Sequence, residues 1–194
     1  MRFVPAILLT AVCLQLGCGG SPSGSDSAAS RTSPQSASAA GGTGAIGRDV
    51  VDTCAGFTPE KAAALLGVQA DTLTDYSGTA GDERVCLYRD PNDYEHTVSF
   101  NLTHEDSVQA ARGSMAAYRE NFGEAQRVID GATGSTSAQA AVQAVGGMGD
   151  EAFFSPVSGA VTFRVANVIV ELFHPEDVEQ RTRVAAAVIE GLKS

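Results

Sequence analysis

The apolar and polar positions divide the chain into three stretches. Almost every residue from Phe3 to Leu16 is apolar, whereas the stretch from Gly19 to Gly47 consists mainly of Ser, Ala, Gly, Thr and Pro. From Arg48 onwards, apolar residues recur at the spacings typical of helices and strands. We therefore expect one folded domain, residues 48–194, which is about the size that a single hydrophobic core supports.

Three segments of this domain predict helices. Segment 58–67 has Thr58 as an N-cap, a proline in its first turn and Gly67 as a left-handed C-terminal residue. Segment 105–122 carries apolar residues at alternating spacings of three and four, which predicts one apolar face, and Gly123 is expected to end it. The same spacing predicts a last helix, whose apolar stripe consists of Val178, Thr182, Ala185, Ile189 and Leu192.

Four segments predict strands. The apolar residues in 98–102 alternate with polar ones, and 85–88 predicts a shorter strand. Segments 161–165 and 168–172 predict a hairpin around Ala166-Asn167, although this turn lacks the glycine that hairpins favour. Strands paired through hairpins, with amphipathic helices between them, favour an α+β fold: an antiparallel sheet with helices packed on one face.

The charge of the chain argues against one class of partner. The formal net charge is −10, and no basic stripe is present. Such a surface repels phosphate backbones, so we expect no nucleic-acid partner.

The N-terminal apolar run has the features of an export signal. Its length fits the ~7–15 residues of a signal-peptide core and falls short of the ~20 that span a bilayer. The run ends in Gly17-Cys18, which resembles the lipobox of bacterial lipoproteins, where a small residue precedes a cysteine that is diacylated and becomes the first residue. Gln15 stands where leucine is usual in that motif. We expect a signal peptide over 1–17 and lipidation of Cys18.

The polar stretch after Cys18 predicts a tether. Residues 18–47 hold few apolar side chains, so they bury too little surface to offset the entropy of ordering the chain. Two acyl chains on Cys18 would anchor the protein stably. We therefore expect a lipid-anchored protein on the extracytoplasmic face of the cell membrane, with the membrane as one partner.

The remaining cysteines favour a disulfide. Cys13 lies in the leader, which leaves Cys54 and Cys86 in the domain. Two such thiols in an exported domain most often pair. Free thiols and a metal site are the alternatives, but a zinc site needs two further ligands at close spacing, and the histidines offer none.

The order of short motifs resembles a family of small actinobacterial lipoproteins that carry a domain of unknown function. The matching motifs are Asp52-Thr53-Cys54, Thr58-Pro59-Glu60, Leu65-Leu66-Gly67, Cys86-Leu87-Tyr88 and Gly147-Met148-Gly149-Asp150-Glu151-Ala152, followed by a hairpin and a closing helix. Ala166 stands where glycine is common in that family. The resemblance implies an α+β domain with a Cys54–Cys86 disulfide outside the cytoplasmic membrane, and no established reaction. A related arrangement in the outer sensor domains of bacterial Ser/Thr kinases suggests binding in a cleft, by analogy only.

Motifs that could carry chemistry have simpler structural interpretations. Gly147-x-Gly149-x-x-Ala152 fits a dinucleotide fingerprint, but a strand rather than a helix is expected after it. The run His104-Glu105-Asp106-Ser107 collects the residue types of a triad, yet consecutive residues at a helix start are better explained as capping. We expect a domain that is not an enzyme and has no cofactor and no metal. The alternatives are an envelope enzyme with scattered site residues or a structural spacer.

One region is the best candidate for a ligand cleft. Gly147 to Glu151 combines flexible backbone with two acids, and loops at the ends of a sheet often carry function. Phe153 and Phe154 follow in a strand, so they point to opposite faces. We expect a cleft for a small ligand or an envelope protein to include Met148, Asp150 and either Phe153 or Phe154. In the competing interpretation, Met148 and both rings are covered by a helix.

Overall fold

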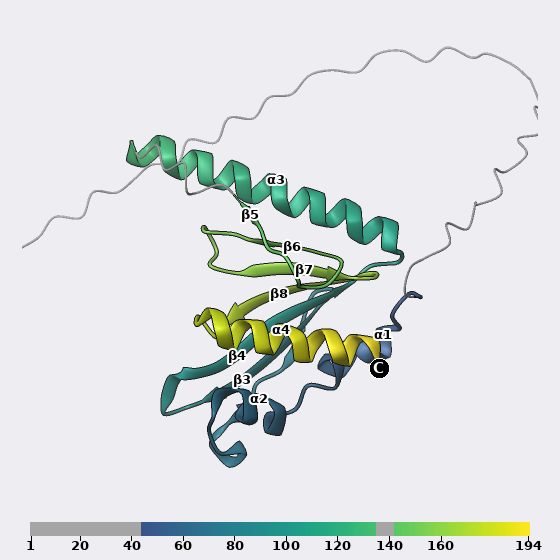
Figure 1. The fold of residues 1–194 in the computed structure, drawn as a ribbon, viewed down its shortest axis with the longest axis vertical. Helices are drawn as coiled ribbons and strands as arrows, with labels where there is room; N and C mark the ends of the chain where they lie inside the picture. Colours follow the sequence, from purple (N-terminus) through teal and green to yellow (C-terminus); the bar gives the residue numbers. More distant parts are fainter. Residues whose placement is uncertain (1–43, 135–141) are drawn as a thin grey trace, which may run out of the picture. The chain divides into compact units, whose positions relative to one another are not determined.

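The computed structural model describes residues 44–134 and 142–194, so the expected signal peptide, Cys18 and nearly all of the expected tether lie outside the described residues. In the described part, eight strands form one antiparallel sheet (Figure 1). The strands are β1 (Thr74–Asp75), β2 (Gly78–Ala80), β3 (Glu83–Asp90), β4 (Asp93–His104), β5 (Gln143–Ala144), β6 (Glu151–Phe154), β7 (Val161–Val165) and β8 (Val168–His174). Their order is β1-β3-β4-β8-β7-β6-β5, and β2 also pairs with β3.

Four α-helices and two short 3₁₀ turns accompany the sheet in the described residues. They are α1 (Arg48–Asp52), η1 (Cys54–Gly56), α2 (Pro59–Leu66), η2 (Ala70–Thr72), α3 (Val108–Thr133) and α4 (Val178–Lys193). The caps expected for α2 are confirmed: Thr58 accepts a hydrogen bond from the Lys61 amide, and Gly67 has a left-handed φ of 74°.

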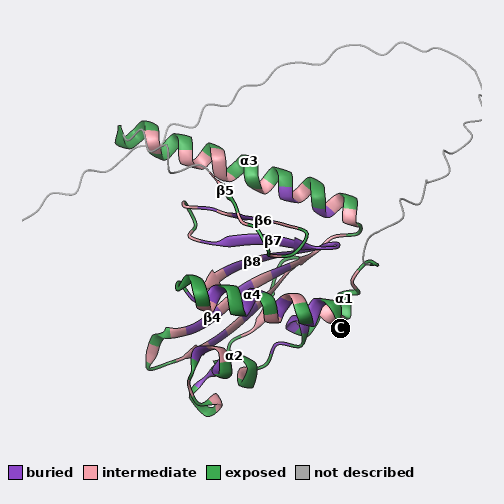
Figure 2. Ribbon diagram, viewed as in Figure 1, coloured by how far each residue is buried: buried purple, intermediate pink, exposed green. Residues whose placement is uncertain are grey.

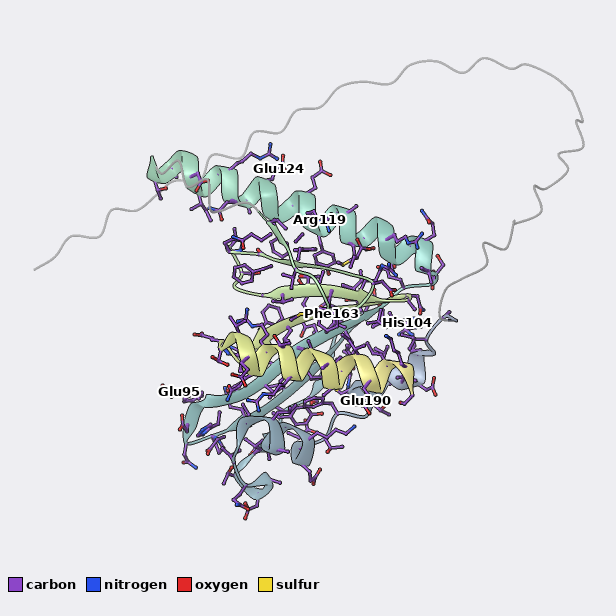
Figure 3. The ribbon with its side chains drawn as sticks, viewed as in Figure 1. Glu95, His104, Arg119, Glu124, Phe163 and Glu190 are labelled. Atoms are coloured by element: carbon purple, nitrogen blue, oxygen red, sulfur yellow. A yellow bond between two sulfur atoms is a disulfide. The ribbon has the colours of Figure 1, made fainter. Side chains whose placement is uncertain are left out.

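The larger core lies between the sheet and helices α1, α2 and α4. Strands β7 and β8 form its centre: all five residues of β7 and four of the seven residues of β8 are buried (Figure 2). Because side chains alternate along a strand, Val168, Val170 and Leu172 all point to this face. Phe163 from β7 lies on the same face, beneath α4 (Figure 3). Each such side chain contributes ~1.5–3 kcal/mol on burial, so this layer dominates the stability of the domain.

A second, smaller core covers the opposite face of the sheet. Ala111 and Met115 of α3 pack against Phe153 of β6 and Ile169 of β8. Figure 1 shows α3 and α4 separated by strands β6 to β8. The α+β class with an antiparallel sheet is confirmed. Its helices differ from the expectation in one respect, because α3 lies on the other face from α1, α2 and α4.

Helix α3 is longer than the sequence pattern indicated. It begins at Val108, after Ser107, whose side chain accepts a hydrogen bond from the Ala110 amide. The prediction that Gly123 ends it is wrong: the helix continues to Thr133, and Gly134 is the left-handed cap. A single glycine costs a helix only ~1 kcal/mol relative to alanine, which is too little by itself to end the helix.

Helix α4 is rotated relative to its predicted stripe. Ala185 and Leu192 are buried as expected, but Val178 is 74% exposed. The buried positions that the prediction missed are Arg181, Val184, Val188 and Gly191. The true buried seam is therefore shifted by about one residue, because the helix packs against η1 and α2 as well as the sheet.

A disulfide ties the N-terminal part of the domain to the sheet. Cys54 in η1 is bonded to Cys86 in β3, which confirms the expected pair. Cys54, Ala55 and Gly56 all have positive φ, so the chain makes a left-handed turn here. Helix α4 crosses this turn where Gly191 meets Ala55, and a Cβ on Gly191 would collide with the Ala55 carbonyl oxygen.

The folded domain begins earlier than expected. Ile46, assigned from the sequence to the tether, packs against the larger core. Its amide donates a 2.7 Å hydrogen bond to Oδ1 of Asn167, in the turn between β7 and β8. Nδ2 of Asn167 also donates to the Glu105 carbonyl at 2.9 Å. Asn167 therefore joins three segments that are far apart in the sequence.

Candidate functional site

A pocket of about 620 Å³ opens on the α4 face, at the end of the β7–β8 hairpin opposite its turn. Strand residues Phe154, Val161 and Phe173 form part of its wall, and the start of α4 closes another side. Its polar residues are Ser158 from the β6–β7 loop, His174 at the end of β8, and Glu176, Arg181 and Thr182 at and before the start of α4. A concave apolar site of ~300–1,000 Å³ with a few polar groups is typical of small-ligand sites.

The strand alternation of β6 places one of the two predicted phenylalanines in this pocket. Phe154 is partly exposed and lines the pocket, together with Met148 from the preceding loop. Phe153 points to the other face, where it is fully buried and its ring contacts Phe122 of α3 at 6.2 Å between centroids. That these side chains receive a ligand stays a prediction.

A β-bulge brings a further aromatic residue to the pocket. Ser99 of β4 pairs with His174 of β8, but the next residue, Phe100, pairs with Leu172. Phe173 is therefore the extra residue of the bulge. Bulges redirect side chains locally, and here Phe173 lines the pocket instead of facing α3 with Ile169. The sequence carried no signal of this shift.

Arg181 is the charged residue most deeply set in the pocket wall. Only 8% of it is exposed. Its Nε donates to the Pro175 carbonyl at 3.0 Å, and Nη2 donates to the Glu176 carbonyl at 3.3 Å. The guanidinium lies 6.0 Å from the centre of the Phe154 ring. Burial lowers the pKa of Arg181, while the nearby Glu176 and Asp177 carboxylates act in the opposite direction.

Arg181 forms no ion pair with a carboxylate of the described residues. None of the ion pairs found in residues 44–134 and 142–194 includes it. Buried cations are normally paired, because leaving water costs several kcal/mol per ion. Sequence reasoning missed this residue, although Arg181 lies one helical turn before Val184 and Ala185 and so belongs to the same buried stripe.

Asp150, predicted to line the cleft, has a structural role instead. Its carboxylate accepts hydrogen bonds from Arg164 at 2.9 Å and from the Ala166 amide at 2.8 Å. The neighbouring Glu151 also accepts from Arg164, at 2.8 Å, and lies near Arg119, a residue of α3 that Figure 3 labels. Asp150 is therefore engaged by the β7–β8 turn and does not line the pocket.

The Gly-x-Gly motif lies in the same loop as Asp150, and its second glycine packs against β7. Gly147 and Gly149 have φ of 81° and 60°, values that favour glycine. A Cβ on Gly149 would collide with the Arg164 carbonyl oxygen, to which the Asp150 amide donates a 2.7 Å hydrogen bond. The motif leads into strand β6, as expected, and holds the loop against β7.

The His104–Ser107 run does not assemble a triad. Ser107 caps α3, and Nε2 of His104 lies 2.9 Å from the Ile46 carbonyl oxygen. Glu105 accepts a hydrogen bond from Ser114 in α3. These side chains position the start of the domain and the start of α3.

Two acids of the sheet, Glu83 and Glu171, lie close enough to Tyr118 of α3 for their charges to act on it. Burial, followed by the charge of Glu83, raises the pKa of Glu171 on β8. Burial also raises the pKa of Tyr118 on α3, and the charge of Glu171 adds to it. Glu83 is partly satisfied by a 3.2 Å hydrogen bond from Asn101.

Metal-binding clusters and membrane-spanning helices are two other features that the described residues could contain. No group of three or more His, Cys, Asp or Glu side chains there could hold a metal ion. In the same residues, no helix has both the length and the apolar character needed to cross a membrane. No family model, curated protein or solved structure matches this chain.

Proposed function

We propose that this chain is a lipid-anchored extracytoplasmic protein whose domain binds a small ligand in the pocket at the start of α4. The observation that carries the proposal is the pocket itself. Phe154, Phe173 and Val178 present apolar surface there that a closed core would bury. A mere spacer would have no need of such a cavity, and apolar surface left open to water carries a cost that a ligand would relieve.

The place of the pocket in the fold supports access to a ligand. The chain enters the domain at Ile46, which is bound to Asn167 at the turn of the β7–β8 hairpin. The pocket lies at the other end of that hairpin, near Val161 and Phe173. The hairpin thus separates the point where the tether joins from the pocket, and a membrane attached through that tether need not cover the opening.

The proposed location rests on the leader, on Cys18 and on the disulfide. A stable Cys54–Cys86 bond is favoured in oxidising compartments and rare in the cytosol. Expressed with its leader, the chain should be acylated on Cys18, as seen by intact mass spectrometry and membrane fractionation. Cys18→Ala should abolish the acylation. An unmodified mature N-terminus at another residue of the wild-type protein would overturn this part of the proposal.

The binding role can be tested with a neutral apolar fluorophore, N-phenyl-1-naphthylamine. We expect the full chain to enhance its fluorescence saturably, and Val178→Glu to weaken this by placing a charge on the pocket rim. Val128→Glu is the matched control, because Val128 is 71% exposed on α3, away from the pocket. Both positions are exposed, so both variants should fold. Equal effects of the two variants, or no saturable binding, would contradict the proposal.

A further inference from the structure

We propose that the pocket selects a singly charged carboxylate amphiphile, with its acyl chain on the apolar wall and its carboxylate bound by Arg181. This inference rests on the proposed function and names the chemical class of the ligand. The apolar wall and the buried guanidinium lie in one cavity, and together they match the two ends of such a molecule.

The apolar end of the ligand is specified by Phe154, Phe173 and Met148. These side chains come from β6, from the bulge in β8 and from the loop before β6, and they surround the same space. None of them offers a strong hydrogen-bonding group, so this wall favours a chain of methylenes over a polar molecule. Each further methylene that is buried there should raise affinity about fourfold, until the chain fills the pocket.

The charged end is specified by Arg181. Two of its five donors are used by the Pro175 and Glu176 carbonyls, and these two bonds hold the guanidinium plane in place. Within residues 44–134 and 142–194, its other donors have no protein acceptor, and the residue lines the pocket. A carboxylate matches the remaining fork of donors and would supply the partner that a buried cation lacks.

The charges around the pocket favour a ligand head group with one negative charge over a head group with two. Glu176 also lines the pocket, and both Glu176 and Asp177 are exposed carboxylates close enough to influence Arg181. The whole chain carries a net charge of −10. A dianionic phosphate head would double both its attraction to Arg181 and its repulsion from these acids, but its desolvation cost rises with the square of the charge, so a single cation offsets less of that cost.

The test compares decyl probes that differ only in their heads, using calorimetric titration of the full chain with Cys18→Ala, without detergent. Decanoate should bind at least tenfold more tightly than decanol, decyl phosphate and decyltrimethylammonium, and acetate should not bind. Arg181→Met should lower decanoate affinity at least tenfold and leave decanol unchanged, whereas Arg181→Lys should retain part of the preference. Arg183→Met is the matched control, because Arg183 is an exposed arginine on the same helix outside the pocket.

Thr182→Glu provides a second variant in case Arg181→Met fails to fold. Thr182 is exposed and lines the pocket beside Arg181, so the added carboxylate should weaken decanoate and spare decanol. Equal binding of decanoate and decanol, unchanged by either variant, would overturn the assignment of the head and leave the proposed function intact. Tighter binding of decyl phosphate would also overturn it. If neither the decyl probes nor the neutral fluorophore binds, the proposed function itself fails.

Discussion

Gly191 of α4 offers a sharp test of how the N-terminal turn packs against the last helix. Gly191→Ala would place a Cβ against the Ala55 backbone, 2.9 Å from the carbonyl carbon and closer still to its oxygen. Ala55 cannot easily retreat, because it has a left-handed φ of 56° and follows the disulfide-bonded Cys54. The substitution should therefore destabilise the domain.

The magnitude follows from two opposing effects. Alanine is better than glycine inside a helix by ~1 kcal/mol, and by less near the end, where Gly191 lies. Overpacking against a backbone that cannot move costs ~1–3 kcal/mol. We expect a net loss of about 1–2 kcal/mol, which lowers Tm by roughly 3–6 °C in a domain of this size.

Gly113→Ala and Gly123→Ala in α3 are the matched controls. Apart from the backbone of α3 itself, a Cβ at either position meets no atom of the described residues within 4 Å, so only the gain in helix propensity remains. Both should raise stability, by up to ~1 kcal/mol each. Urea denaturation followed by circular dichroism gives the change in midpoint at constant m-value. A Gly191→Ala protein as stable as the wild type would show that α4 does not lie against Ala55 as described.

Three further predictions concern the sheet and its connections. Glu171→Gln should raise Tm at pH 7 but not at pH 4. The pKa of Glu171 is raised, so the stability that its protonated form contributes is present at low pH and is lost as the pH rises through the folded-state pKa. Equal Tm shifts at both pH values would contradict this. Replacing Cys54 and Cys86 together with alanine should lower the free energy of unfolding, measured by urea denaturation, by about 3–4 kcal/mol, since the bond closes a loop over a sequence separation of 32. A loss below about 1 kcal/mol would argue against the loop-entropy account. Asn167→Ala should cost about 1–3 kcal/mol and speed amide exchange at Ile46, whose amide loses its acceptor; unchanged exchange there would show that the hydrogen bond is not formed in solution.

Much of the local structure followed from the sequence because its causes are local. The caps of α2, Thr58 and Gly67, depend on side-chain and backbone preferences within one turn. The apolar stripe of α3 and the alternation of β7 and β8 depend on the periods of the helix and the strand. Both patterns were confirmed, because Met115 packs in the smaller core, whereas Phe163 and Val170 lie in the larger one. For the same reason, Phe153 and Phe154 had to face opposite sides of the sheet.

The features that make the pocket were decided by packing between distant segments. The pattern of α3 says which face of the helix is apolar, but not which side of the sheet that face will cover. The bulge at Phe173 exists only in the register between β4 and β8, some seventy positions apart in the chain. From the sequence alone, Arg181 would be expected to be an exposed helix residue. It is buried in the structure because α4 packs against η1 and α2. The spacing of apolar residues along the chain therefore determined the helices and strands. Contacts between distant segments, which no local pattern encodes, decided which side chains share the pocket.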